Sequence, residues 1–121
     1  MKKTNIIIIL SIFTLFILSA CAPNLPAKAD DLAKCLTEKG AVMYGTEWCP
    51  HCAAQKEMFG SSFEYVTYVD CDKNKRACVN AGVKGYPTWQ INEANYEGTQ
   101  SLYDLAKNSG CTLTPTTQEG S

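Results

Sequence analysis

The apolar residues of this chain change repeatedly between the three-to-four spacing of an amphipathic helix and the unbroken or alternating pattern of a strand. Helices are predicted over residues 30–39, 50–59, 72–81 and 101–108, and strands over residues 41–44, 63–69, 88–91 and 95–97. This order predicts an α/β fold, with a mixed sheet of about four strands flanked by helices on both faces.

Capping residues set two of the predicted helix ends. Asp30 or Asp31 can cap the first helix and Gly40 can end it. Ser101 and Asp104 form a capping-box-like start for the last helix.

The N-terminal segment has the pattern of an export signal. Lys2 and Lys3 precede an apolar run over residues 6–18, which is shorter than the roughly 20 residues of a membrane-spanning helix but fits a signal peptide. Small residues then precede Cys21. This order resembles the bacterial lipoprotein signal, and the resemblance implies lipid on the Cys21 sulfur and cleavage before it. An ordinary secretory signal and a retained membrane helix are the alternatives.

Each alternative places the rest of the chain outside the cytoplasm, where disulfides persist. We therefore expect a protein that is lipid-anchored to a bacterial membrane, on the periplasmic side or at the cell surface. The expected organisation is a signal peptide over residues 1–20, a lipidated cysteine and tether over 21–29, one domain over 30–111 and a flexible tail over 112–121.

Composition narrows the classes of partner. The formal net charge is −1 at pH 7, and the basic residues Lys73, Lys75 and Arg76 form only a short charged loop. Nucleic acid is therefore not an expected partner.

The cysteine count is high, at 7 in 121 residues. Without Cys21 the number is even, which suggests full pairing in an exported domain. Two of these cysteines form the motif Cys49-Pro50-His51-Cys52 behind Trp48. If they pair with each other, three connectivities remain for the other four, Cys35, Cys71, Cys78 and Cys111.

The C-x-x-C motif predicts thiol–disulfide exchange. Cys49 opens a predicted helix, whose dipole and free N–H groups favour a reactive thiolate. Cys52, one turn further, is expected to be the more buried, resolving thiol. Pro50 shapes the first turn. His51 can place a positive charge or an N–H donor near the Cys49 thiolate, or be an exposed spacer without a role.

The chain resembles the thioredoxin superfamily over roughly residues 30–111. The resemblance rests on Trp48 to Cys52, on Gly85-Tyr86-Pro87-Thr88, on the hairpin and on Gly98. Segments 36–40, 43–45 and 55–59 are more closely similar to the thioredoxin-like domain of bacterial vitamin K epoxide reductase homologues, here expected as a stand-alone lipoprotein. That resemblance implies a quinone-linked membrane oxidoreductase of this type as the redox partner.

The superfamily resemblance also implies a substrate-binding loop at Pro87. The peptide bond before Pro87 would be cis, the loop would pack against Cys49 and Cys52, and Tyr86 would offer its backbone to an extended substrate. Trp48 and Tyr86 would cover the disulfide. The alternatives are a trans proline that opens a strand, and simple core packing for Trp48.

Two departures from reducing thioredoxins indicate the direction of exchange. The Pro50-His51 pair resembles the DsbA oxidants, and Met43 stands where thioredoxins carry a buried aspartate, with Glu47 only a weak substitute. We expect a thiol–disulfide oxidoreductase that donates disulfides to exported proteins with cysteines. The alternative is a thiol reductase or isomerase of such proteins.

The remaining cysteines have two interpretations. Cys71 and Cys78 would form a structural bridge, similar to an extra pair in the resembling domain, or a second redox pair that relays electrons. Cys35 and Cys111 would then pair by elimination. No bound cofactor or metal is expected.

Two rival functions fit parts of this pattern. A metal site could use Cys49, Cys52, Cys71 and Cys78, although six residues separate the second pair rather than the two to four typical of structural zinc sites. The other rival is a non-catalytic binding lipoprotein that keeps the fold.

Overall fold

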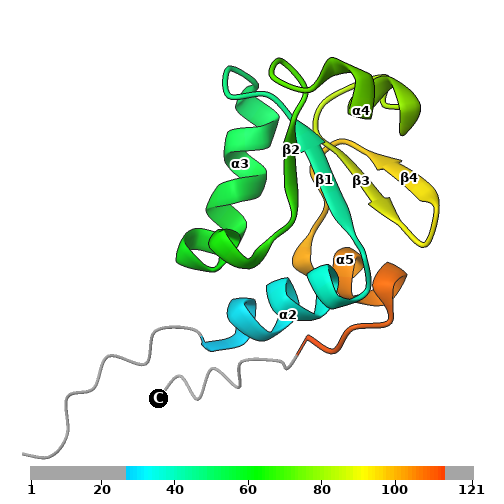
Figure 1. The fold of residues 1–121 in the computed structure, drawn as a ribbon. Helices are drawn as coiled ribbons and strands as arrows, with labels where there is room; N and C mark the ends of the chain where they lie inside the picture. The colour runs from blue at the N-terminus through cyan, green and yellow to red at the C-terminus, as the bar shows by residue number, and fades with distance from the viewer. Residues whose placement is uncertain (1–26, 114–121) are drawn as a thin grey trace, which may run out of the picture.

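One mixed sheet with the strand order β2-β1-β3-β4 runs through the molecule (Figure 1). The computed structural model of the chain describes residues 27–113, so the expected signal peptide and Cys21 lie outside the described residues. β1 (Val42–Gly45) pairs in parallel with β2 (Tyr68–Asp70) and antiparallel with β3 (Thr88–Ile91). β3 in turn pairs antiparallel with β4 (Ala94–Glu97).

Helices surround this sheet. They are α2 (Ala27–Glu38), α3 (Pro50–Phe59), α4 (Lys75–Asn80) and α5 (Leu102–Ser109), with a 3-10 helix, η1 (Gly60–Tyr65), directly after α3. In Figure 1, α3 lies along one side of the sheet, α4 lies near the upper ends of the strands, and α2 and α5 lie together below. The predicted α/β architecture is confirmed, and the fold is thioredoxin-like. Within residues 27–113, no helix has both the length and the apolar character needed to cross a bilayer.

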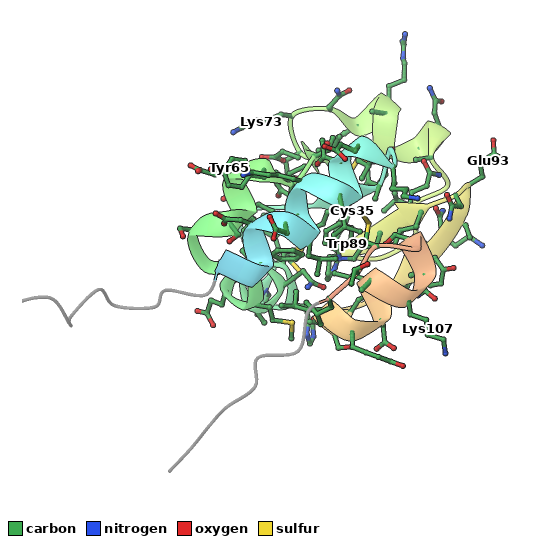
Figure 2. All side chains as sticks on the ribbon, turned by 90° about the horizontal axis from the view of Figure 1, so that it is seen from below. Cys35, Tyr65, Lys73, Trp89, Glu93 and Lys107 are labelled. Atoms are coloured by element: carbon green, nitrogen blue, oxygen red, sulfur yellow. A yellow bond between two sulfur atoms is a disulfide. The ribbon has the colours of Figure 1, made fainter. Side chains whose placement is uncertain are left out.

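Alternate side chains along the strands point to opposite faces of the sheet, and each face has its own apolar cluster. Met43, Trp89 and Ile91 are fully buried in the larger cluster, to which α2, α3 and α5 contribute side chains. Trp89, labelled near the middle of Figure 2, has no exposed surface. Tyr44 points to the opposite cluster, which contains Cys78 of α4. Helices therefore cover both faces of the sheet, as the alternation of strand and helix predicted.

The first helix starts earlier than expected. It begins at Ala27 rather than near Asp30, so residues 27–29 belong to the helix and not to the expected tether. Alanine and lysine favour helix, and Ala29 is buried against the fold. Asp30 does not act as the cap; its carboxylate accepts a hydrogen bond from Ser62 Oγ and so ties α2 to η1.

The strand expected over residues 63–69 is wrong in its first half. Residues Gly60–Tyr65 form η1, and only Tyr68–Asp70 pair as a strand. The aromatic residues that favour a strand are used for packing instead, because the Phe63 ring lies edge-on to both Phe59 and Tyr68. Packing against neighbouring elements overrides β propensity here.

The helix expected over residues 72–81 is also shorter. The Asp70 carboxylate accepts hydrogen bonds from the backbone N–H groups of Asp72 and Lys73, which holds a turn after β2. α4 therefore begins at Lys75. The other boundaries follow the local signals closely: α3 spans Pro50–Phe59, and Ser101 Oγ accepts from the Asp104 N–H at the start of α5.

Candidate active site

Cys49 is the N-cap residue of α3. Its backbone is extended (φ −79°, ψ 118°), and its sulfur accepts a hydrogen bond from the Cys52 N–H at 3.3 Å. Pro50 follows in the first turn, where its missing N–H is not needed. A sulfur in this position faces the positive end of the helix dipole.

The loop that contains Pro87 meets this sulfur. The Tyr86–Pro87 peptide bond is cis, and the Cys49 thiol donates to the Tyr86 carbonyl oxygen at 3.6 Å. Pro87 is fully buried. The two sequence motifs that suggested thiol chemistry therefore lie side by side, although 37 residues separate their contact atoms along the chain.

Cys52 is the more buried of the two thiols. Its exposed fraction is 1%, against 5% for Cys49, and both are free cysteines. Burial, followed by a side-chain hydrogen bond with Cys49, raises the pKa of Cys52 to about 11, while the nearby Thr46 backbone acts in the opposite direction. Cys52 is therefore a neutral thiol at physiological pH.

This raised pKa predicts alkaline sensitivity of the reduced protein. Between the ordinary thiol value of 9.0 and about 11, folded Cys52 keeps its proton while the unfolded chain releases it. Its contribution to the free energy of unfolding is fully present below this window and is lost as the pH rises through it. Urea unfolding across the window should show a steeper loss for the reduced protein than for a Cys52→Ala variant. Parallel curves for the two proteins would contradict the assignment.

Trp48 and Tyr86 border the thiols. The Trp48 side chain is 69% exposed, so core packing is excluded for it. Its ring meets the Tyr86 ring edge-on at a centroid distance of 6.1 Å, and Trp48 Nε1 donates to Asp72 Oδ2 at 2.8 Å. An exposed aromatic surface is therefore fixed in place beside Cys49.

Within residues 27–113, His51 contacts a distant segment through its backbone. His51 is exposed, and its carbonyl oxygen accepts from Thr99 Oγ1 at 3.3 Å. Among the hydrogen bonds of residues 27–113, none joins the imidazole to Cys49. The tuning role of His51 stays a prediction.

Two residues bear on the question of a proton acceptor for Cys52, Met43 by its position and Glu47 as a replacement. Met43 is fully buried in the larger cluster. Glu47, the weak candidate for a replacement acid, is exposed and forms an ion pair with Lys56 at 3.3 Å. Its carboxylate is thereby held by Lys56 at the surface.

Sequence reasoning missed the structural part played by Gln55. Its Oε1 accepts from Trp89 Nε1 at 3.1 Å and from the Gln100 N–H at 2.7 Å, while its Nε2 donates to the Gln100 carbonyl oxygen at 3.0 Å. This fully buried amide fixes α3, and with it Cys52, to β3 and to the segment after β4. The sequence signal that could have revealed its burial was its three-to-four spacing from Cys52 and Phe59, which places it on the inner face of α3.

The other four cysteines form two disulfides. Cys71 joins Cys78 across the turn between β2 and α4, and Cys35 of α2 joins Cys111 after α5. Figure 2 shows Cys35 on α2, next to α5. Since Cys71 and Cys78 are bonded to each other, they are not ligands of a shared four-cysteine site. In the described part of the chain, no group of three or more cysteine, histidine or carboxylate side chains is placed to hold a metal ion.

Similar proteins support the thiol chemistry of the motif. No family model matches the chain. It is 42% identical over 91 residues to "Thiol-disulfide oxidoreductase LTO1" of Arabidopsis thaliana, covering 68% of this chain and 24% of that protein. It is 35% identical over 85 residues to "Protein disulfide isomerase-like 2-2" of Oryza sativa, covering 58% of this chain and 23% of that protein. The chain thus spans about a quarter of each relative's length.

Proposed function

We propose that this member of the thioredoxin superfamily is a thiol–disulfide oxidoreductase that works through Cys49 and Cys52. The observation that carries the proposal is that the N-terminus of α3 and the cis-proline loop both contact the sulfur of Cys49. Cys49 is a free cysteine at the N-terminus of α3, and its sulfur touches the carbonyl of the residue before the cis-proline. Relatives named as thiol–disulfide oxidoreductases and disulfide isomerases add support.

In the proposed oxidation, a substrate thiolate attacks Cys49 in the Cys49–Cys52 disulfide. A mixed disulfide forms on Cys49, the bond to Cys52 breaks, and the Cys52 sulfur takes the electron pair and then a proton. A second substrate thiolate attacks the substrate sulfur of the mixed disulfide and releases Cys49 as a thiolate. Two electrons pass from the substrate to the protein, and the reverse sequence reduces a substrate disulfide.

The surroundings of Cys49 suit an extended substrate segment. The Tyr86 carbonyl, 3.6 Å from the Cys49 sulfur, can accept a hydrogen bond from a substrate backbone N–H once the mixed disulfide has replaced the Cys49 thiol. The exposed Trp48 ring offers an apolar contact on the same side. A site that binds the substrate through its backbone and through contact with the Trp48 ring would accept polypeptides of many different sequences.

We propose disulfide donation as the main direction. Met43, which belongs to the same buried cluster as Cys52, provides no proton acceptor, and Glu47 is held by Lys56; both features disfavour thioredoxin-like reduction. Any interaction that stabilises the reduced form makes the disulfide a stronger oxidant, and the N-terminal position of Cys49 on α3 is the proposed source of such stabilisation. Thiol reduction or isomerisation is the second candidate, favoured by the relatives named as disulfide isomerases.

The proposed setting is outside the cytoplasm. The signal-like segment over residues 1–20 and the lipid-accepting Cys21 would anchor the domain to a bacterial membrane. Two disulfides besides the active pair suit an oxidising compartment. Substrates would be exported proteins with cysteines, and a quinone-linked membrane oxidoreductase of the vitamin K epoxide reductase type would re-oxidise Cys49 and Cys52.

An oxidation assay tests the direction. The oxidised protein is mixed with a reduced, unfolded disulfide protein, and loss of substrate thiols is followed by alkylation. We expect oxidation well above the rate given by the same concentration of glutathione disulfide. If that oxidation is absent while the reduced protein rapidly reduces insulin, the direction is reversed and the reductase alternative holds.

A further inference from the structure

A second side chain reaches the space around the Cys52 sulfur. β1 ends at Gly45, and a Cβ atom on this glycine would lie 2.8 Å from Cys52 Sγ, 3.3 Å from Tyr68 Cε2 and 3.5 Å from Tyr68 Oη. The bare Cα of Gly45 therefore leaves one small space that the Cys52 sulfur and the Tyr68 hydroxyl both border. Neither the C-x-x-C motif nor the proline loop contains Tyr68.

The Tyr68 hydroxyl has no partner in this space. Tyr68 Oη is one of two buried side-chain oxygen atoms without a hydrogen-bond partner within the described residues. Its ring is nevertheless held by two neighbours: it packs edge-to-face with Phe63 at a centroid distance of 5.8 Å, and Lys56 Nζ lies 4.3 Å from its centroid. A buried hydroxyl that stays unpaired is unfavourable and requires an explanation.

We propose that Tyr68 is the hydrogen-bond donor that stabilises the Cys52 thiolate when the Cys49–Cys52 disulfide is cleaved. The proposal rests on the function proposed above. Tyr68 would act on the same sulfur whose pKa the Thr46 backbone already lowers. Gly45 serves this arrangement because any side chain there would enter the space between Cys52 and Tyr68.

The hydroxyl acts as a donor and not as a base. Burial, followed by the negative charges of Glu47 and Asp70, raises the pKa of Tyr68 above its ordinary value, so the hydroxyl keeps its proton. The other titratable groups around the two side chains are Lys56 and Cys49. A group that stays protonated can donate to a thiolate throughout the working pH range.

The need for a donor follows from the chemistry of the step. When a thiolate attacks Cys49, the sulfur–sulfur bond breaks and its electron pair passes to Cys52 Sγ. Because Cys52 is buried, its thiolate is unfavourable until it takes a proton from the solvent. The proton balance is kept because the attacking thiol released its own proton to the solvent when it became a thiolate. A hydrogen bond from Tyr68 stabilises that short-lived anion, whereas the neutral Cys52 thiol of the resting reduced form gains much less.

A Tyr68→Phe variant tests the proposal, since it removes one oxygen and keeps the ring that packs against Phe63 and Lys56. The oxidised protein is mixed with dithiothreitol, and cleavage of the Cys49–Cys52 bond is followed by rapid alkylation. Because hydrogen bonds to charged groups are the strong ones, we expect cleavage about tenfold slower in this variant. The equilibrium with glutathione at pH 7 should change by less than about twofold, because reduced Cys52 is neutral in both proteins.

Tyr96→Phe is the matched control, because Tyr96 is also a partly buried tyrosine packed against the larger cluster. It should cleave at the parent rate. The proposal is overturned if the disulfide of Tyr68→Phe is cleaved within about twofold of the parent rate, since that change is smaller than the loss of one hydrogen bond to an anion. An equal loss of rate in both variants also overturns it, because the effect would then not be specific to Tyr68.

A second measurement separates this proposal from the proposed function. The NMR chemical shift of the Cys52 Cβ atom, followed against pH in the reduced protein, reports the Cys52 thiolate separately from Cys49. Tyr68→Phe should raise the pKa of Cys52 further, whether or not the protein exchanges disulfides with substrates. An unshifted titration overturns the role of Tyr68. Failure of the parent to react with any thiol, with the titration still shifted, overturns the proposed function and leaves the hydrogen bond supported.

Discussion

Replacing Cys49 with alanine is expected to reduce disulfide exchange to the uncatalysed rate, whereas Cys52→Ala should retain the first half of the reaction. The reason is positional: Cys49 lies at the N-terminus of α3 beside the Tyr86 carbonyl, and Cys52 is buried behind it as a neutral thiol. Only Cys49 can meet a substrate sulfur. A chromogenic aromatic disulfide measures this, because one equivalent of coloured thiol is released for each attack.

The two variants should differ in what accumulates. Cys52→Ala is expected to stop as a mixed disulfide on Cys49, since the resolving thiol is absent. Cys49→Ala should form no adduct during the same time. Faster reaction of Cys49→Ala than of Cys52→Ala would reverse the roles assigned to the two cysteines.

Removing either structural disulfide is the second change with a large expected effect. The Cys35–Cys111 bridge closes a sequence separation of 76 residues and the Cys71–Cys78 bridge one of 7. In the loop-entropy description these bridges stabilise the fold by about 4.5 and about 2.5 kcal/mol, respectively. Urea unfolding of Cys35→Ala/Cys111→Ala and Cys71→Ala/Cys78→Ala measures both losses.

The same variants distinguish a structural bridge from an electron relay. Cys71→Ala/Cys78→Ala should be less stable but should still exchange disulfides through Cys49 and Cys52 at low temperature, where it stays folded. A variant that keeps parental stability and loses turnover with a membrane partner would show that Cys71 and Cys78 relay electrons.

Local sequence signals were sufficient for much of the fold and for the central cysteines. Pro50 in a first turn and Gly60 after Phe59 bound α3 at the predicted residues, and Ser101 caps α5. The Cys49–Cys52 spacing and the Tyr86–Pro87 pair were enough to locate the thiol chemistry along the chain. These features depend on residues that are neighbours in the sequence.

The contacts that were missed depend on pairing between distant segments. β propensity over residues 63–69 gave no warning that Phe63 packs on Phe59 and that Gly60–Tyr65 form η1. The approach of Tyr68 to Cys52 requires the parallel register of β1 and β2, which places Met43 opposite Tyr68 and brings Gly45 beside Asp70. A periodic pattern shows which face a residue occupies, but not which side chain from another element it meets there.

The most direct test of the account is a redox titration of the chain against glutathione, with every cysteine assigned by peptide mass. The account predicts that Cys49 and Cys52 alone pass reversibly between two thiols and one disulfide, while Cys35–Cys111 and Cys71–Cys78 stay bonded throughout. Cys49 and Cys52 that remain unlinked at every glutathione ratio, or a Cys71–Cys78 bond that opens first, would contradict it.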